Sequence, residues 1–172
     1  TLSGALGGTG GFDKAGAGTL TLTGTNSYAG ATSVTTGTLL VNGTNNGTGL
    51  TSVTTGAALG GSGTLVGAVD VGAGATLFAG QPTGATVGVL TVGDLTLNAT
   101  SNLNFEFGAP NISGLPDNDL IIVNGNITLA GLLNVTQPAM IVLIAWALIG
   151  ERLRLGQLLG IAVACVGVVV IV

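Results

Sequence analysis

Alternating apolar and polar residues dominate most of the chain. Over residues 18–43 the sequence GTLTLTGTNSYAGATSVTTGTLLVNG alternates aliphatic side chains with threonine and is interrupted by glycine and asparagine. A period of two places every second side chain on one face, so this pattern predicts short β-strands with one buried face. We expect Leu20 and Leu22 to share that face, and Leu39 and Val41 to continue it.

Part of this pattern returns at a nearly constant spacing. The phrase Val-Thr-Thr-Gly begins at Val34 and again at Val53, and related phrases begin at Val71, Val92 and Val123. The first four valines follow one another at spacings of 19, 18 and 21 (53−34, 71−53 and 92−71). A strand-and-turn unit that recurs about every 20 residues is typical of a solenoid, whose units bury their apolar faces only by stacking.

The recurring phrase favours an all-β fold, a parallel β-helix, over a β-sandwich, because a sandwich built from hairpins does not require one. We expect Val34, Val53, Val71 and Val92 to line up in one interior column. The inward side chains are small or branched aliphatics, which suit close contact between coils. Threonine at the alternate positions suits a solvated outer face.

Four stretches interrupt the alternation and predict turns or loops. Residues 26–30 form a turn by composition, and residues 44–49 form a polar loop rich in asparagine and glycine. Proline marks two longer loops, at residues 81–84 and residues 110–118. Because loops escape the constraint of stacking, we expect any binding to use the last three of these stretches.

The alternation resumes between and after the longer loops. Residues 102–107 predict a strand with Leu103, Phe105 and Phe107 on one face. The last predicted β segments cover residues 120–123, 127–129 and 132–135.

Residues 138–172 change to an almost entirely apolar composition. Two apolar runs, residues 138–150 and 155–172, are separated by a charged turn. As helices they would be about 20 Å and about 27 Å long, against a hydrocarbon core of roughly 30 Å. The pattern predicts an apolar helical hairpin, a candidate membrane segment whose second run could span with slight strain. The charged residues of its turn are Glu151, Arg152 and Arg154.

Charge divides the chain at the same point, so we expect two parts, residues 1–137 and residues 138–172. The net charge is −4: the first part carries one lysine and six acids (1−6 = −5), and the second carries +1. An acidic surface without a basic stripe argues against nucleic-acid binding.

The sequence offers little catalytic or metal-binding chemistry. It contains no histidine, and its single cysteine, Cys165, lies in the apolar part, which excludes an internal disulfide and a cysteine-based metal site. Most of its acids are scattered about one per coil rather than paired, unlike those of polysaccharide-cleaving enzymes. We therefore expect no enzyme, no cofactor, and no catalytic, cofactor-binding or metal residue.

Two stretches resemble calcium-binding motifs but depart from them. Asp117 and Asp119 lack a third ligand at Ile121 and the glycine of an EF-type loop, so both are interpreted as turn acids. Residues 7–13, GGTGGFD, approach the calcium nonapeptide, but the aspartate, Asp13, comes one place late and the unit does not repeat.

The stretch from Gly11 to Leu39 resembles the passenger-associated repeat of bacterial autotransporters. The residues that carry the resemblance are Gly-Phe-Asp-Lys-x-Gly-x-Gly-Thr-Leu-x-Leu-x-Gly-x-Asn-x-Tyr-x-Gly-x-Thr, followed by Gly-Thr-Leu at Gly37. The match is close over this stretch and looser as far as Gln137. It implies a right-handed parallel β-helix that is exported to the bacterial surface.

Residues 138–172 resemble the last hairpin of EamA-type drug/metabolite transporters. The resemblance is carried by Pro138, by the Ile-Gly-Glu-Arg-Leu segment that ends at Leu153, and by Gln-Leu-Leu-Gly ending at Gly160. The first helix of the family's hairpin begins before the proline, where this chain has β-type sequence. A natural fusion of the two parts and an artefactual joining both remain open.

Three functional hypotheses follow from these features. The first is a structural fragment of an autotransporter passenger: a β-helical stalk or scaffold at the bacterial cell surface or outer membrane, or secreted, with adhesion through its loops. The second is a fragment of a membrane protein related to small-molecule transporters and anchored in the inner membrane by residues 138–172. The third is a polysaccharide-binding module. The corresponding partners are a cell-surface or polysaccharide ligand and, for the second hypothesis, a membrane.

Overall fold

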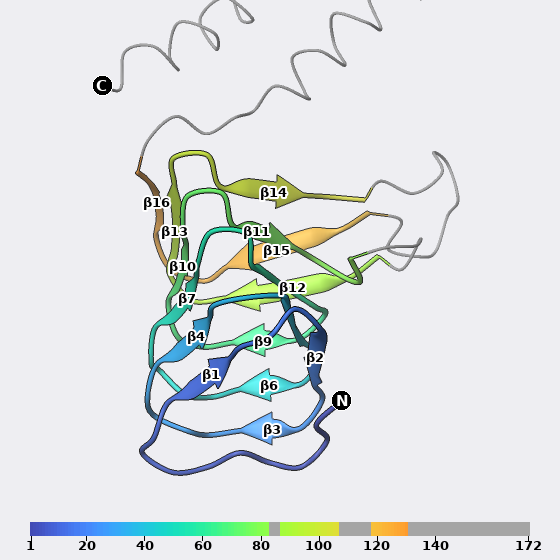
Figure 1. Cartoon of the computed structure of the whole chain (residues 1–172), viewed down its shortest axis with the longest axis vertical. Coiled ribbons are helices and arrows are strands. Elements are labelled where there is room, and N and C mark those ends of the chain that lie inside the picture. The colour runs from blue at the N-terminus through green and yellow to red at the C-terminus, as the bar shows by residue number, and fades with distance from the viewer. Residues whose placement is uncertain (83–86, 107–117, 131–172) are drawn as a thin grey trace, which may run out of the picture.

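The computed structural model describes residues 1–82, 87–106 and 118–130, in which the chain winds into coils stacked along one axis (Figure 1). Each coil contributes one strand to each of three sheets. The strands are β1 (Phe12–Lys14), β2 (Thr19–Leu22), β3 (Thr25–Asn26), β4 (Thr32–Val34), β5 (Thr38–Val41), β6 (Thr44–Asn45), β7 (Thr51–Val53), β8 (Ala58–Gly60), β9 (Thr64–Leu65), β10 (Val69–Val71), β11 (Thr76–Phe78), β12 (Val89–Val92), β13 (Leu95–Asn98), β14 (Asn102–Asn104), β15 (Leu120–Val123) and β16 (Ile127–Ala130).

Neighbouring strands in all three sheets are parallel. The first sheet has the order β1-β4-β7-β10-β13-β16, the second β14-β11-β8-β5-β2 and the third β15-β12-β9-β6-β3. Strands that neighbour one another within a sheet are therefore one coil apart in sequence. This arrangement is consistent with a parallel β-helix and confirms the predicted all-β, parallel architecture.

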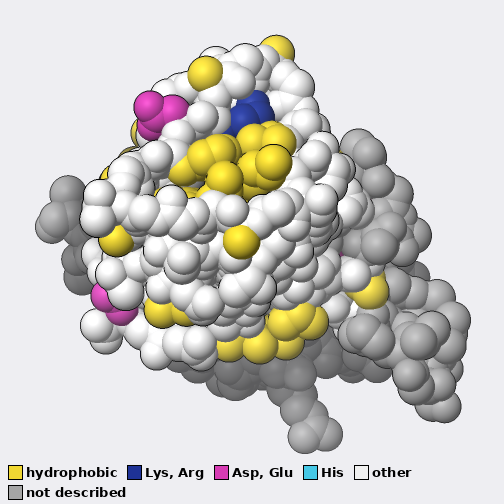
Figure 2. Space-filling view, turned by 90° about the horizontal axis from the view of Figure 1, so that it is seen from below, with side chains coloured by type: hydrophobic (Ala, Val, Ile, Leu, Met, Phe, Trp, Pro, Cys, Tyr) yellow, Lys and Arg dark blue, Asp and Glu magenta, His cyan; other side chains and the backbone are white. Residues whose placement is uncertain are grey.

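Stacked aliphatic side chains form the core. In the first sheet Val34, Val53 and Val71 are register partners. In the second sheet Leu39 pairs with Leu59, and Leu59 with Leu77; all three side chains are fully buried. Figure 2, an end-on view from the side of the first coil, shows hydrophobic side chains gathered at the end of the stack, and a surface that is mostly uncharged and polar.

Val92 does not continue the valine column, so the prediction of one column for all four valines was wrong. The register partner of Val71 in the first sheet is Leu97. Val92 lies instead in the third sheet, between Leu65 and Val123. The cause is a longer coil, because the additional residues in the loop before β12 leave Val92 one sheet short of the first sheet. The repeat at Val92 and the repeat at Val123 are nonetheless stacked directly on each other.

Coil length varies while the register between strands is kept. In the first sheet the sequence offsets between register partners are 20, 19 and 18 (32−12, 51−32 and 69−51) and then 26 and 32 (95−69 and 127−95). The extra residues leave the strands in place, because they are accommodated between the second and third sheets.

Two further predictions are corrected by the structure. Residues 44–49, predicted as a polar loop, are a loop only in part, since β6 occupies Thr44 and Asn45 and both Asn45 and Gly47 are buried. The strand predicted over residues 102–107 ends at Asn104; Leu103 packs against the core, but Phe105 is 40% exposed. The chain leaves the sheet after Asn104 because the backbone of the following residues is bound elsewhere, as described below. Phe107 lies outside the described residues.

Glycine occupies the corners where stacked coils come closest. At the corner between the second and third sheets, an added Cβ on Gly63 would lie 2.0 Å from the carbonyl oxygen of Gly43, and one on Gly43 would lie 2.2 Å from that of Gly24. Because real Cβ atoms do not approach an oxygen this closely, a side chain at either position would force the coils apart. A second glycine column, between the third and first sheets, contains Gly30, Gly49 and Gly67.

The corner between the first and second sheets uses glycine for a different reason. Gly16, Gly37, Gly56 and Gly74 occupy equivalent places in successive coils, and each has a positive φ, between 69° and 84°. Residues with a Cβ rarely adopt this conformation. The next coil places Thr100 there, at φ 65°, as the one non-glycine residue with positive φ among those described.

A buried hydrogen-bonded group explains the tyrosine of the repeat. The hydroxyl of Tyr28 lies 2.7 Å from Oγ1 of Thr32 and accepts a hydrogen bond of 2.9 Å from Nδ2 of Asn45 in the next coil. Asn26, directly below Asn45 in the third sheet, accepts a hydrogen bond from the backbone N–H of Leu6. The polar residues of the repeat therefore join successive coils, because buried polar groups need such partners.

The apolar part predicted as a helical hairpin, residues 138–172, lies outside the described residues, as do the predicted β segment at residues 132–135 and the expected membrane contact. Within residues 1–82, 87–106 and 118–130, no helix has the length and apolar character needed to cross a membrane.

Candidate functional site

Two long connections leave the stack at the same corner. Between the second and third sheets the first three coils need only residues 23–24, 42–43 and 61–63. The next two coils use residues 79–88 and 105–119 for the same step, and Figure 1 shows the described ends of both connections on one side of the molecule. We call these two connections the loop corner; the structure describes its residues 79–82, 87–88, 105–106 and 118–119.

The first connection is closed at its base. The backbone N–H of Gly80 donates a hydrogen bond of 2.9 Å to the carbonyl of Gly61. An added Cβ on Gly88 would lie 2.4 Å from Cα of Gly80, so the two ends of this connection are in backbone contact. The loop therefore begins and ends at one point of the stack.

Asp119 closes the second connection and joins it to the first. Its Oδ2 accepts a hydrogen bond of 2.8 Å from the backbone N–H of Glu106, and its own N–H donates to the carbonyl of Glu106 at 2.9 Å. Its Oδ1 accepts a hydrogen bond of 2.9 Å from the N–H of Gly88. Asp119 is 7% exposed, so one buried carboxylate holds the bases of both loops together.

We predict that Asp119→Asn loosens the loop corner without unfolding the stack. An amide offers one oxygen where the carboxylate offers two, so the N–H of Gly88 or Glu106 is left facing an NH₂ group. An unpaired buried donor costs about 1–2 kcal/mol. Hydrogen exchange should become about tenfold faster at the amides of Gly88 and Glu106 and should stay unchanged in β7. Asp13→Asn, at an exposed carboxylate, is the control; equal protection in both variants would contradict this role.

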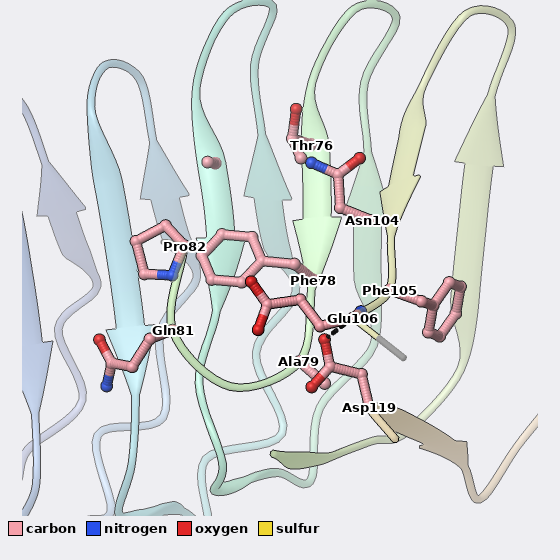
Figure 3. A pocket seen from close by; sticks show the side chains of 10 residues that line it. Thr76, Phe78, Ala79, Gln81, Pro82, Asn104, Phe105, Glu106 and Asp119 are labelled. Atoms are coloured by element: carbon pink, nitrogen blue, oxygen red, sulfur yellow. Dashed lines mark hydrogen bonds between the residues drawn. The ribbon is translucent and has the colours of Figure 1, made fainter. Parts of the chain in front are cut away.

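A pocket of about 280 Å³ lies at the base of the loop corner, on the outer face of the second sheet (Figure 3). Phe78 forms part of its wall, and its ring lies against the backbone of Gly60, where an added Cβ would be 2.2 Å from Cε2. Figure 3 shows the Glu106 side chain directed toward Phe78 and Pro82, whereas the ring of Phe105 points the other way. The lining residues are Ala58, Thr76, Phe78, Ala79, Gln81, Pro82, Asn104, Phe105, Glu106 and Asp119.

Asp119 serves as a backbone acceptor, which agrees with its interpretation as a turn acid, while Asp117 lies outside the described residues. Asp13, from the stretch that approaches the calcium nonapeptide, is exposed on β1. In the part of the chain that the structure describes, no three residues among His, Cys, Asp and Glu are grouped as metal ligands would be. That the chain has no catalytic, cofactor-binding or metal residue stays a prediction.

Other acids join neighbouring coils. Oδ1 of Asp94 accepts a hydrogen bond of 2.7 Å from the N–H of Asn126, and Oδ1 of Asp70 accepts one from Nδ2 of Asn98. Sequence reasoning missed these contacts and the pocket at Glu106. The available signal was an acid in one coil followed, a coil later, by an asparagine at the end of a strand or just before one.

Lys14, the lysine of the repeat, occupies the first position of the interior column that Val34, Val53 and Val71 continue in the first sheet. Lys14 is buried as the register partner of Val34, and its Nζ donates to the carbonyls of Gly16 and Thr36 at 2.6 and 2.8 Å. The ring of Phe12 lies against the core and 6.0 Å from the ring of Tyr28. Lys14, Phe12 and Tyr28, which belong to the repeat motif, thus contribute to the packing of the first coils.

Coils of this kind, with parallel strands in register and glycine at the corners, define a β-solenoid repeat protein. Comparison with known families specifies the repeat: residues 12–41 match the passenger-associated-transport-repeat. The chain is also 45% identical over 140 residues to the Adhesin BmaC autotransporter of Brucella suis biovar 1 (strain 1330), an alignment that covers 81% of this chain. The chain spans about 4% of the length of that relative. No solved structure matches the chain significantly.

Both comparisons confirm the predicted resemblance of the chain to autotransporter passengers. They give no support to the resemblance of residues 138–172 to EamA-type transporters.

Proposed function

We propose that the chain is a segment of an autotransporter passenger that acts at the bacterial surface, or after secretion, as a stiff scaffold displaying the loop corner to a partner on another cell. Its winding is right-handed and its role involves no catalysis. The confirmed passenger repeat supports the location, and the relative named an adhesin supports the contact with another cell.

The confinement of both long connections to one corner is the observation that carries this proposal. The stack keeps its register across coils of very different length, because the additional residues leave the sheets at a single edge. The outer positions of the first sheet carry short hydroxyl or carboxyl side chains that are in register from coil to coil. Loops of different length on a rigid and regular scaffold are typical of a binding surface.

Exchange of the second loop tests the proposal. Residues 107–117 are replaced by a short Gly-Ser linker, which is feasible because Glu106 and Asp119 are hydrogen-bonded to each other at the base. The full chain, coupled to beads, is applied to a monolayer of cultured mammalian cells. We expect attachment to fall at least tenfold while the circular dichroism spectrum stays β-rich.

The matched control changes the outer face of the first sheet instead, with Ser33, Ser52 and Thr96 replaced by alanine. This variant is expected to attach like the unaltered chain. Loss of attachment in the control and not in the loop variant would place recognition on the first sheet and overturn the proposal. Absence of attachment by the unaltered chain would contradict an adhesive role for this segment and leave only that of a stalk.

A further inference from the structure

An unpaired carboxylate oxygen distinguishes the pocket of the loop corner. Among the described residues, Oε2 of Glu106 is buried and has no hydrogen-bond partner. The backbone N–H of the same residue is already bound to Asp119, which fixes where the side chain begins. Buried polar atoms in folded proteins nearly always have partners, so this oxygen marks a place where a donor is missing.

The chain offers no cation for this oxygen in its described part. Lys14 is the one lysine or arginine there, and its Nζ is engaged by carbonyl groups in the first two coils, far along the stack from Glu106. The net charge of residues 1–137 is −5 (1−6), so the stack as a whole presents a negatively charged surface. Such a surface attracts positively charged groups and raises their rate of association.

The remaining walls of the pocket suit a flat cation. Phe78 and Pro82 provide apolar surface beside the carboxylate, and an aromatic ring attracts a cation placed over its face. Gln81 and Asn104 also line the pocket, and the oxygen of an amide side chain can accept a hydrogen bond from an additional N–H group. A guanidinium has five donors in one plane and stacks on aromatic rings, so it matches this set better than an ammonium or a neutral hydroxyl.

We propose that the pocket receives an arginine side chain of a protein ligand on the opposing cell, with its guanidinium bound to Glu106 and packed against Phe78. This inference rests on the proposed adhesive function and adds the chemistry of the partner to it. A volume of about 280 Å³ accommodates one such side chain and excludes a folded segment.

Titration of the full ¹⁵N-labelled chain with the peptide Ac-Gly-Arg-Gly-NH₂ tests the proposal. We expect chemical-shift changes centred on Phe78 and Glu106, and weak, millimolar binding because the probe is small. Glu106→Gln keeps the shape of the side chain and should weaken binding about tenfold or more, the effect of losing a hydrogen bond to a charged group. Asp13→Asn changes the net charge equally on a distant exposed face and should leave binding unchanged.

Four outcomes would overturn this inference. These are absence of binding by the unaltered chain, equal weakening by both variants, equal binding of Ac-Gly-Gln-Gly-NH₂, and preferential binding of a neutral sugar such as methyl α-D-glucoside. The adhesion assay separates this failure from failure of the proposed function. If Glu106→Gln attaches to cells normally and the loop exchange does not, the arginine pocket is wrong and the display function stands.

Discussion

Leu59→Ala is expected to lower the free energy of unfolding by about 2–5 kcal/mol, the range for a buried leucine that leaves a cavity. Leu59 is 0% exposed and lies between Leu39 and Leu77 in the second sheet. Because each coil contacts only its neighbours, the cavity cannot be filled by rearrangement elsewhere in the stack. Urea denaturation followed by circular dichroism measures the loss.

Leu50→Ala provides a matched control for this prediction. Leu50 belongs to the same coil region but is 43% exposed, so the same deletion should change stability by less than about 0.5 kcal/mol. Similar losses in the two variants would show that the aliphatic columns do not hold the coils together.

Gly63→Ala is expected to cost about 3 kcal/mol or more, at the upper end of the range for added volume in a packed interior. The added methyl group would lie 2.0 Å from the carbonyl oxygen of Gly43 and 2.7 Å from that of Val41. Both obstacles are backbone atoms of the coil below, which cannot rotate away as a side chain would. The two coils must therefore separate locally, which also weakens the hydrogen bonds between them. Thermal and urea denaturation together measure this loss.

The same substitution at Gly18 should be nearly neutral. An added Cβ there meets no atom within 4 Å, and Gly18 is not among the glycines with positive φ. Gly18→Ala should even stabilise the chain slightly, because alanine restricts the unfolded state. If Gly63→Ala were as well tolerated as Gly18→Ala, close approach of backbones would not explain the glycine columns.

The architecture of the regular coils could be predicted from the sequence because its signals are local. Alternation identifies the inward face at Leu39 and Val41, and a nearly constant spacing relates Val34 to Val53 and Val71. Both signals lie within one coil or between two adjacent coils. The structure confirms the columns that these residues form.

Val92 shows where this reasoning fails. Its spacing from Val71 differs only slightly from the regular repeat, yet the loop before β12 places it in another sheet. A spacing counts residues but does not show whether they lie in a strand or outside the stack. Composition misled in a different way at residues 44–49, because the stretch predicted as a polar loop begins with β6 and contains the buried Asn45 and Gly47.

The candidate site could not be predicted because its contacts join distant parts of the chain. Asp119 binds the N–H of Gly88, 31 residues away (119−88), and no local pattern marks this pair. Glu106 gains its significance only from burial at the pocket wall. In the sequence, Asp119 looks like an ordinary turn acid and Glu106 like an isolated glutamate, and only the stacking of the coils brings the two residues into contact.

Distances between spin labels on the outer face of the first sheet test the stacked-coil account most directly. In a Cys165→Ser background, cysteines at Asp13 and Thr96 lie four strands apart, and cysteines at Asp13 and Thr128 lie five strands apart. At about 4.8 Å per strand, the backbones of the labelled positions are roughly 19 and 24 Å apart, so the label-to-label distance from double electron–electron resonance should increase by a single step for the one additional coil. A distance to Thr128 that exceeds the distance to Thr96 by several such steps, or falls below it, would contradict the stack.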